Sequence, residues 1–339
     1  MERRVEFDIM KGIGILLVML GHTNIFYGAC QIPFWCNRII NSFHVPMFFI
    51  IAGYFSKTYD GSWKESLRKC VKRLLFPFLI TAGIVVVYNA AVAIKRQDLD
   101  LLWGVMGSYL IGDPTHRIPD AIGFPIDMGV GPVWFLLALF WAKVAFLFIS
   151  RAGKWTEVIC VTISIGCAGF GIFHTLPFGL LQGGTALGFL AVGHWCRSHK
   201  LPIWLMVVCV ACWIVSLAFG LRIGPYSAYY PLYPLNILSV CGASLCVFWL
   251  SKLMARVSWV KSFFEMLGRN SMNLLCVHTV DMRCNLVRLG IKHVSSSMIV
   301  AFPWVCLIVD YTFSIVVAFL IKGKRIRQFV DTSRIRNIL

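Results

Sequence analysis

About ten long apolar segments follow one another along this chain, and they constrain its fold more than any other feature. A helix of about 20 mostly apolar residues is long enough to cross the hydrocarbon core of a bilayer. A window of about 19 residues places the segments at 9–29, 39–56, 74–94, 130–150, 157–173, 178–196, 201–220, 235–250, 265–286 and 298–321. The sequence therefore predicts an all-α, polytopic transmembrane helical bundle of about ten spans.

The composition excludes a water-soluble fold. Hydrophobic residues make up 58% of the chain and charged residues 14%, whereas soluble domains are about 45–50% apolar and about 25% charged. The apolar runs are continuous and do not alternate with polar residues, which also excludes a transmembrane β-barrel. Because the connections between the runs are short, we expect a single membrane domain over residues 1–339 and no separate soluble domain.

Positive charge is divided unevenly between the two sides of the predicted bundle. The formal net charge is +17, and the Lys and Arg residues lie at the ends of the apolar segments. With the N-terminus in the cytoplasm, 23 of them fall on the cytoplasmic side and 8 on the other, and Lys143 lies inside a span. The positive-inside rule then predicts that both termini are cytoplasmic, in a multi-pass protein of the inner (cytoplasmic) membrane. Topology and anionic lipid account for this charge, so we expect no nucleic-acid partner.

Polar side chains inside apolar segments are costly in hydrocarbon and therefore mark candidate functional positions. In the first segment, Lys11 and His22 are eleven residues apart, which is within about 20° of three full helical turns. We expect both side chains on one helix face, about 16 Å apart, with Asp8 one turn before Lys11. This stripe predicts a polar site. The structural alternative is a Lys that reaches the membrane surface and a His bonded to a neighbouring carbonyl.

Two further polar groups also have a structural alternative. His44 lies just before Pro46, so its ring either lines a site or bonds to the backbone carbonyl that the proline frees. Lys69, Lys72 and Arg73 precede the third segment on its cytoplasmic side. This basic cluster is suited either to lipid headgroups or to the phosphates of a cytoplasmic cofactor.

The ninth segment is rich in polar residues. Ser271 and His278 are seven positions apart and share a helix face, and Asp281 follows one turn later. A structural ion pair of Asp281 with Arg283 or with His278 is one interpretation of these positions. The intramembrane histidines have no acidic or Cys partner at ligand spacing, so no metal site is expected.

Two loops on the extracytoplasmic side are candidates to cover a cavity. Residues 96–129 contain an apolar stretch at 101–111 and then a part rich in Pro and Asp. Residues 222–234 carry four tyrosines. Tyrosines in such a place form an aromatic belt at the membrane interface, and their rings can also stack on sugars.

Five short motifs occur in a recognisable order. They are Phe7-Asp8 with Lys11 and His22, the stretch from Phe43 to Tyr54, the stretch from Lys72 to Pro77, the stretch from Gly131 to Leu136, and the stretch from Asn270 to His278. Together they resemble the acyltransferase type 3 family of integral membrane O-acyltransferases, in the branch similar to fucose O-acetyltransferases. The resemblance spans nearly the whole chain. In the wider family the basic residue eleven positions before the His is Arg, so Lys11 is a departure.

The resemblance implies an enzyme that transfers an acyl group, usually acetyl from cytoplasmic acetyl-CoA, to a hydroxyl of an extracytoplasmic or lipid-linked sugar or polysaccharide. An alcohol needs a positioned base, and a neutral imidazole is the usual one. His22 is thus the candidate general base, or an acyl-carrying nucleophile, with Asp8 and Lys11 orienting the pocket. The other candidates are Lys69, Lys72 and Arg73 for the CoA phosphates and His44, Trp134, Asn273 and His278 for the pocket wall.

The alternative from another class is a transporter or flippase, with His22 in a polar permeation or proton path. A structural or sensor membrane protein is a third reading. Many transporters consist of two repeated halves with broken helices, and the sequence contains no internal repeat of that kind.

Overall fold

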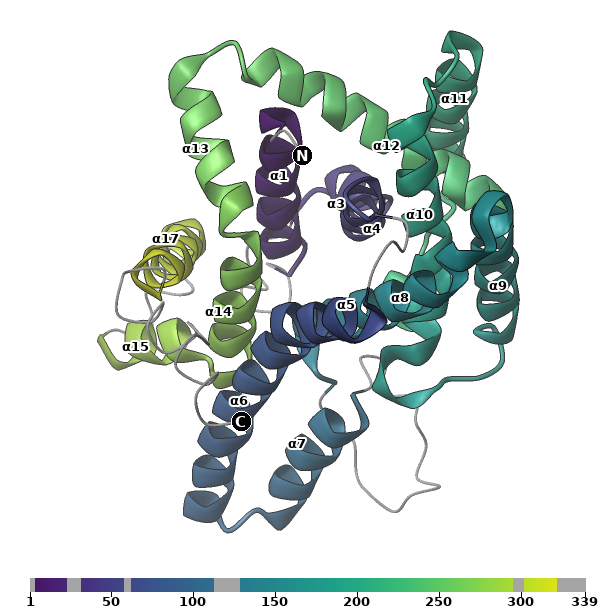
Figure 1. The fold of residues 1–339 in the computed structure, drawn as a ribbon. Helices are drawn as coiled ribbons and strands as arrows, with labels where there is room; N and C mark the ends of the chain where they lie inside the picture. The colour runs from purple at the N-terminus through teal and green to yellow at the C-terminus, as the bar shows by residue number, and fades with distance from the viewer. Residues whose placement is uncertain (1–3, 23–31, 58–61, 113–128, 295–301, 322–339) are drawn as a thin grey trace.

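The computed structural model describes residues 4–22, 32–57, 62–112, 129–294 and 302–321 (Figure 1). Within these ranges the regular structure is helical, apart from one isolated antiparallel bridge between Gly224 and Tyr229. The helices are α1 (Val5–Gly21), α3 (Phe34–Asn41), α4 (His44–Tyr54), α5 (Trp63–Cys70), α6 (Phe76–Arg96), α7 (Leu99–Ile111), α8 (Trp134–Ile149), α9 (Thr156–Phe170), α10 (Leu180–Ser198), α11 (Ile203–Phe219), α12 (Tyr233–Met254), α13 (Ser258–Arg269), α14 (Ser271–Cys284), α15 (Leu286–Val294) and α17 (Pro303–Ile321). The predicted all-α class is confirmed.

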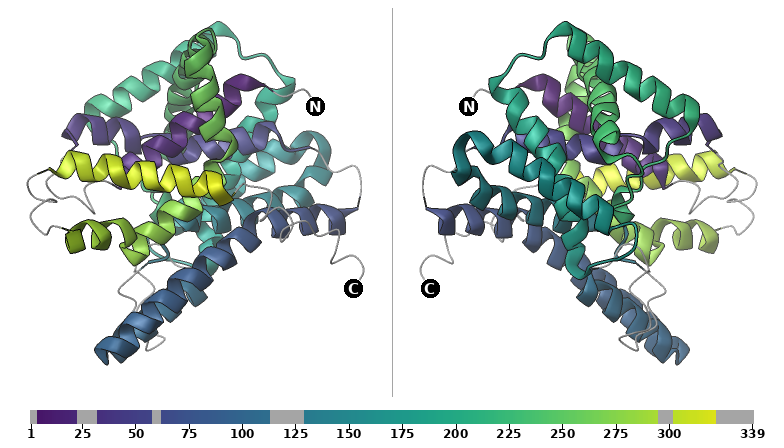
Figure 2. Two further views of the ribbon diagram at one scale, coloured as in Figure 1. Left: turned by 90° about the vertical axis from the view of Figure 1, so that its left-hand side faces the viewer. Right: turned by 90° about the vertical axis from the view of Figure 1, so that its right-hand side faces the viewer.

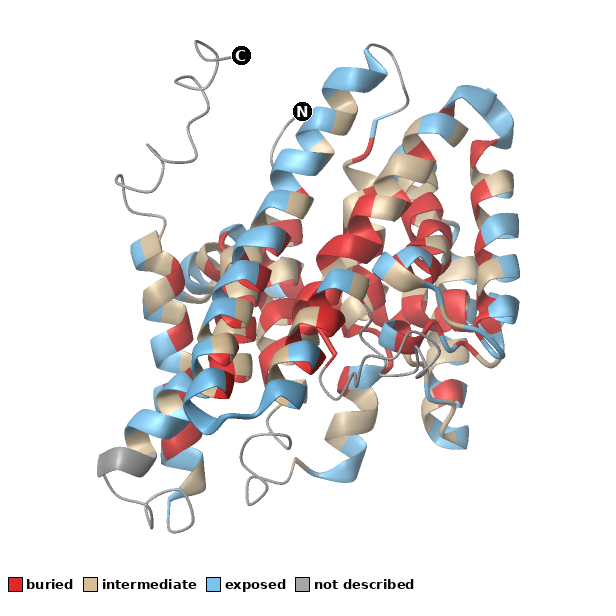
Figure 3. Cartoon of the chain, turned by 90° about the horizontal axis from the view of Figure 1, so that it is seen from below, coloured by how far each residue is buried: buried red, intermediate tan, exposed pale blue. Residues whose placement is uncertain are grey.

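Several helices have the length and surface of membrane-spanning elements. Among the described residues, the segments long and apolar enough to cross a bilayer are Trp63–Arg96, Gly131–Phe170, Tyr233–Met254 and Pro303–Ile321. Large apolar side chains are exposed on outer helix faces, for example Val87 of α6 and Trp204 of α11. Buried residues gather in the middle of the bundle (Figure 3). An apolar outer surface of this kind is suited to contact with lipid.

Two of the predicted apolar segments are each divided in the structure. The segment at 39–56 holds the end of α3 and the whole of α4, with a break before His44. Pro46 is in the first turn of α4, where its missing N–H removes no helical hydrogen bond. The segment at 265–286 is divided at Asn270, whose side chain donates to the Met266 carbonyl oxygen at 2.7 Å. Because the apolar content continues across both breaks, a hydropathy window reports one segment where the backbone forms two helices.

The expected loop at 96–129 contains a helix. The Asp98 side chain accepts a hydrogen bond from the backbone N–H of Leu101 at 2.9 Å, which caps the start of α7. The helix ends at Gly112, with φ +66°. α6 and α7 run side by side and project from the rest of the bundle (Figures 1 and 2). The part rich in Pro and Asp, 113–128, lies outside the described residues.

α10 is a central packing element, in contact with α4, α8 and α9. A Cβ atom on Gly193 would stand 1.9 Å from the carbonyl oxygen of Ile50, and one on Gly53 would stand 1.9 Å from the carbonyl oxygen of Leu190. The crossing of α4 and α10 therefore requires glycine on both helices. This contact fixes α4, which begins at His44.

α1 is held against α13, α12 and α4. A Cβ atom on Gly12 would stand 2.2 Å from the carbonyl oxygen of Phe264, and one on Gly268 would stand 1.7 Å from the carbonyl oxygen of Asp8. The backbones of α1 and α13 thus touch without intervening side chains. Because α13 leads directly into α14, the same contact brings the end of α1, at His22, against α14.

Candidate active site

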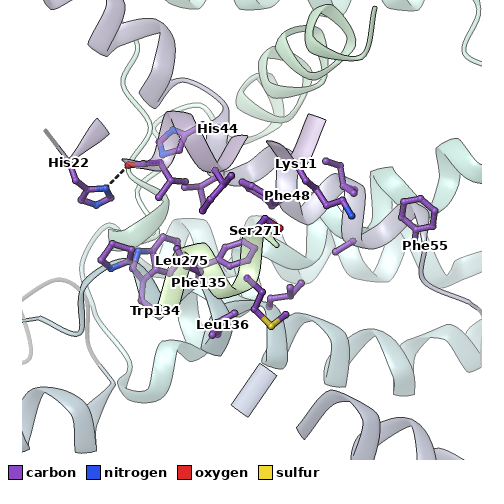
Figure 4. Close-up of a pocket in the computed structure, with 18 residues that line it drawn as sticks. Lys11, His22, His44, Phe48, Phe55, Trp134, Phe135, Leu136, Ser271 and Leu275 are labelled. Carbon is purple, nitrogen blue, oxygen red and sulfur yellow. Dashed lines mark hydrogen bonds between the residues drawn. The ribbon is translucent and has the colours of Figure 1, made fainter. Parts of the chain in front are cut away.

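A narrow cavity of about 270 Å³ runs between α1, α4, α8 and α14. Lys11 and Phe55 line one end, and His22 and Trp134 line the other (Figure 4). The walls between these ends are mostly apolar and include the ring of Phe135. Lys11 and His22, which helical spacing puts on one face of α1, therefore border a single confined space.

His22 is the C-terminal cap of α1, and its two ring nitrogens have different surroundings. Nδ1 lies 2.6 Å from the carbonyl oxygen of Val18. Because a carbonyl oxygen only accepts hydrogen bonds, Nδ1 carries the proton of the neutral ring and Nε2 carries the lone pair. Nε2 has no hydrogen bond to the described part of the chain. The neutral ring therefore has an acceptor nitrogen, Nε2, and the residue lines the cavity.

His44 repeats this arrangement on α4. Its Nδ1 lies 2.7 Å from the carbonyl oxygen of Ile40, and the residue is buried. The structural alternative was a bond to the carbonyl that lacks an N–H donor because of Pro46, which is the carbonyl of Ser42. His44 bonds to Ile40 instead. His44 also lines the narrow cavity. The ring is therefore both bonded to the backbone and placed in the pocket wall.

His278 of α14 stands next to His22. The ring centroids are 5.7 Å apart with an interplanar angle of 63°. His278 is buried, and neither of its ring nitrogens has a hydrogen-bond partner within the described residues. In the same ranges of the chain, no group of three His, Cys, Asp or Glu side chains is placed to hold a metal ion.

An ion pair lies at the other end of the narrow cavity. Lys11 Nζ lies 2.6 Å from Asp8 Oδ1, and Arg269 Nε lies 4.0 Å from Asp8 Oδ2. Arg269 also bonds to Glu265. Asp8 is buried and does not line the cavity, whereas Lys11 does. Of this ion pair, only the Lys11 side chain borders the cavity.

A wide cavity of about 740 Å³ meets the narrow one at its His22 end. His22, His44 and Trp134 line both cavities. The remaining walls of the wide cavity come from α3, from residues 221–226 and from the end of α14. His22 can therefore be approached from two different spaces.

Trp134, at this junction, is positioned by the residues before it. It follows a short 3₁₀ turn, Gly131–Val133, and begins α8. The Tyr109 hydroxyl of α7 donates to the carbonyl oxygen of Val130 at 3.3 Å, immediately before the turn. Burial raises the pKa of Tyr109 to about 12, so its phenol remains a donor at neutral pH. α7 thus ties the start of α8 in place.

Other predicted site residues lie outside the two cavities. Lys69, Lys72 and Arg73 are exposed on α5 and the π-helical turn that follows it, and none of them lines either cavity. Lys69 pairs with Glu65 at 2.6 Å. Asn273 is half-buried and also lines neither cavity. A phosphate-binding role for the basic cluster stays a prediction.

The interpretation of Asp281 as the partner of an ion pair is wrong. Within the described residues, Asp281 pairs with neither Arg283 nor His278; its Oδ1 instead accepts a hydrogen bond from the backbone N–H of Val287 at 2.9 Å. Asn285 between them has φ +51°, and α15 begins directly after it. The carboxylate therefore accepts a hydrogen bond from a backbone N–H in the first turn of α15. Such an N–H has no acceptor within its own helix.

Three arginines at the site were missed by the sequence reasoning. Arg38, Arg222 and Arg283 line the wide cavity. In the sequence they counted only as extracytoplasmic charges or, for Arg283, as a partner for Asp281. They come from α3, from the segment after α11 and from α14. No spacing rule joins positions so far apart, so the sequence carried no signal for this cluster.

The sequence is similar to an acyltransferase family and to a nodulation protein. A family model described as an acyltransferase domain matches residues 4–322. The nodulation protein NolL of Mesorhizobium japonicum is 30% identical over 120 residues, a match that covers 32% of this chain and 32% of that protein. The chain is thus matched to about one third of that relative's length. No solved structure matches the chain.

Proposed function

Since the chain belongs to the acyltransferase type 3 family, we propose that it is a membrane O-acyltransferase that moves an acetyl or other short acyl group from acyl-CoA to a sugar hydroxyl. One observation carries the proposal. His22 lies where the narrow and the wide cavity meet, with Nε2 unoccupied by the described residues. A transferase with two substrates of different size needs a reactive group that both can reach.

His22 is the proposed general base. The acceptor hydroxyl gives its proton to Nε2 while its oxygen attacks the thioester carbonyl carbon. The carbon–sulfur bond breaks, and the protonated imidazole returns a proton to the leaving thiolate. The Val18 carbonyl, bonded to Nδ1, holds the ring in the required tautomer through this cycle. An acyl-His22 intermediate is the second form of the same proposal.

The narrow cavity is the proposed donor path. Its mostly apolar walls and its volume of about 270 Å³ are suited to an extended, thin chain that carries a thioester at its tip. Lys11 and its partner Asp8 stand at the end remote from His22. Lys69, Lys72 and Arg73 are proposed to hold the CoA phosphates outside the cavity, where charge-assisted contacts suit an anionic ligand.

The wide cavity is the proposed acceptor side. It takes a glycan or a lipid-linked sugar, with His44 and Trp134 in the shared wall. The topology that goes with this arrangement has about ten spans in one domain over residues 1–339. Both termini then face the cytoplasm, and the protein lies in the inner membrane. The division of Lys and Arg, 23 against 8, supports this orientation.

A transporter is the second candidate, because two joined cavities also suit a path through the membrane. His22 would then relay protons. The two functions differ in one measurable respect: a transferase consumes acetyl-CoA, and a transporter does not.

The test uses the full chain, purified in detergent, with radiolabelled acetyl-CoA and cell-envelope glycans from cells that lack the protein. We expect label to enter the glycan as an ester that mild base removes, and the His22→Ala variant to transfer at least about 100-fold more slowly. Mass spectrometry of the glycans then identifies the acyl group and the acceptor sugar. Failure of the wild-type protein to consume acetyl-CoA with any envelope fraction would contradict the transferase proposal.

A further inference from the structure

The wide cavity is strongly basic. Arg38, Arg222 and Arg283 line it, and among the described lining residues none is acidic. No ion pair joins any of the three guanidinium groups to the described part of the chain. Three cations without an ion pair to any described residue repel one another around one cavity, and an anion placed between them would remove that repulsion.

Two of these arginines fit against backbone that only glycine provides. A Cβ atom on Gly220 would stand 2.0 Å from Nη2 of Arg38, and one on Gly131 would stand 2.9 Å from Nε of Arg283. Both glycines have left-handed backbone, with φ +72° and +69°, which other residues rarely adopt. A side chain at either glycine would thus displace the neighbouring guanidinium group.

The same two side chains carry buried donors without acceptors. Nε of Arg38 and Nε of Arg283 are buried and have no hydrogen-bond partner within the described residues. A buried donor without an acceptor is unfavourable unless a ligand supplies one. Both groups border the wide cavity, so a ligand there is within their reach.

Arg222 is held beside Arg38 by an aromatic ring. The guanidinium carbon of Arg38 lies 5.8 Å from the centroid of Phe34, and that of Arg222 lies 5.3 Å from the same centroid. Cation–π contacts orient both groups without neutralising them. The planar guanidinium fork is suited to bidentate contact with phosphate or carboxylate oxygens.

We propose that the wide cavity binds an anionic group of the acceptor, a phosphate, diphosphate or carboxylate, and that Arg38, Arg222 and Arg283 hold it. This inference rests on the proposed function, because it assigns the acceptor to the cavity that His22 also lines. A neutral sugar alone would leave the three cations uncompensated. The anion comes either from the phosphates of a lipid-linked sugar or from an acidic sugar, and these sources share the chemistry that the site recognises.

The test measures the thermal stability of the purified full chain in detergent, with coenzyme A present throughout to occupy the donor side. Inorganic pyrophosphate represents the phosphate source and methyl glucuronide the acidic sugar. Methyl glucoside is the neutral control, and sodium chloride matches the ionic strength. We expect pyrophosphate or the glucuronide, but not the glucoside, to raise the melting temperature above the salt control. The more effective anion identifies the source.

Substitutions of the arginines test whether the anion-dependent shift in melting temperature arises in the wide cavity. Arg222→Gln, at an exposed loop position, and Arg283→Gln should each lose most of the anion-dependent shift. Arg288→Gln, which removes an exposed charge of α15 outside the cavity, should keep it. If Arg283→Gln does not fold, Arg222→Gln and Arg222→Lys decide, with the Lys variant recovering part of the shift. Equal shifts in wild type and in the Arg222 variants would overturn the inference.

Acetyl-CoA consumption by the same preparations separates the two proposals. A wild-type protein that consumes acetyl-CoA but responds to no anion would contradict only the anion site. A protein that responds to anions through Arg222 but does not consume acetyl-CoA would contradict the transferase proposal and leave the anion site in place.

Discussion

The imidazole rings of His22 and His278 lie edge to face, with their centroids 5.7 Å apart. His22 is bonded to its own helix through Nδ1, whereas His278 has no hydrogen bond to the described residues from either ring nitrogen. A buried imidazole without partners costs about 1–3 kcal/mol of stability. His278 thus lowers the stability of the fold, and its ring contacts the ring of the proposed base, His22. It is therefore a candidate to position that base.

The substitution His278→Phe tests this relationship. Phenylalanine keeps a ring of similar shape and removes two buried polar atoms without partners, so we expect a melting temperature equal to or above that of wild type. We expect the transfer rate to fall about tenfold or more, which corresponds to about 1.4 kcal/mol in the barrier. Thermal unfolding and transfer assays on the same preparation check both parts. A variant with unchanged kcat would show that His278 only fills space.

Removal of the proposed base should have a larger effect. A positioned general base contributes about 10²–10⁴-fold to a rate, so we expect His22→Ala to lose at least about 100-fold in transfer while its melting temperature stays near that of wild type. His194→Asn is the matched control. His194 pairs with Glu157 at 2.7 Å and lines neither cavity, so its loss should affect stability and leave transfer intact. Substantial transfer by His22→Ala would exclude the base assignment.

Lys11 has both a structural and a functional role to separate. Lys11→Met removes a cation that lies 2.6 Å from the buried Asp8 carboxylate, and we expect a loss of about 1–3 kcal/mol in stability. The double variant with Asp8→Asn removes both charges and should recover most of that stability. We expect the double variant not to recover transfer. Recovery of transfer would show that Lys11 acts only as the counter-ion of Asp8. Lys11→Arg keeps the charge and should retain stability.

Local geometry explains what the sequence predicted well. The common face of Lys11 and His22 follows from helical periodicity within a single segment, and both residues indeed line the narrow cavity. The all-α class follows from the continuous apolar runs. His44 and Trp134 were predicted one by one for the pocket wall, and both line the two cavities. His278, predicted for the same wall, lines neither cavity and lies beside His22.

Tertiary packing explains what the sequence did not predict. His22 and His278 come from two different segments, which meet where α1 packs against α13 and α14, and no single segment contains that information. The wide cavity joins Arg38 to residues far along the chain. Asp281 was given a charged partner by proximity in sequence, but the amide at the start of α15 competes for the same carboxylate.

Membrane orientation is the next prediction. Lys and Arg divide 23 to 8 in favour of one side, so reporters fused after residue 339 and inserted near residue 61 should both report the cytoplasm. A reporter near residue 120 should report the opposite side. Paired alkaline phosphatase and green fluorescent protein fusions check the three positions. An extracytoplasmic signal after residue 339 would mean an odd number of spans.

The last prediction concerns the donor phosphates. Arg73 is exposed and has no ion pair to a described residue, whereas Lys69 is paired with Glu65 at 2.6 Å. A charge-assisted hydrogen bond contributes about 1.5–3 kcal/mol, so Arg73→Gln should raise the KM for acetyl-CoA by about tenfold or more. Lys69→Gln should raise it less, because Glu65 already compensates part of that charge, and Arg73→Lys should recover only part of the loss.

Tyr226→Ala, in the wall of the wide cavity, is the control on the acceptor side. It should change the KM for the acceptor and leave the KM for acetyl-CoA as in wild type. An Arg73→Gln variant with the acetyl-CoA dependence of wild type would remove the basic cluster from the donor site. Lys143 and Arg197, which both donate to Ser56 near the Lys11 end of the narrow cavity, would then be the next cations to test.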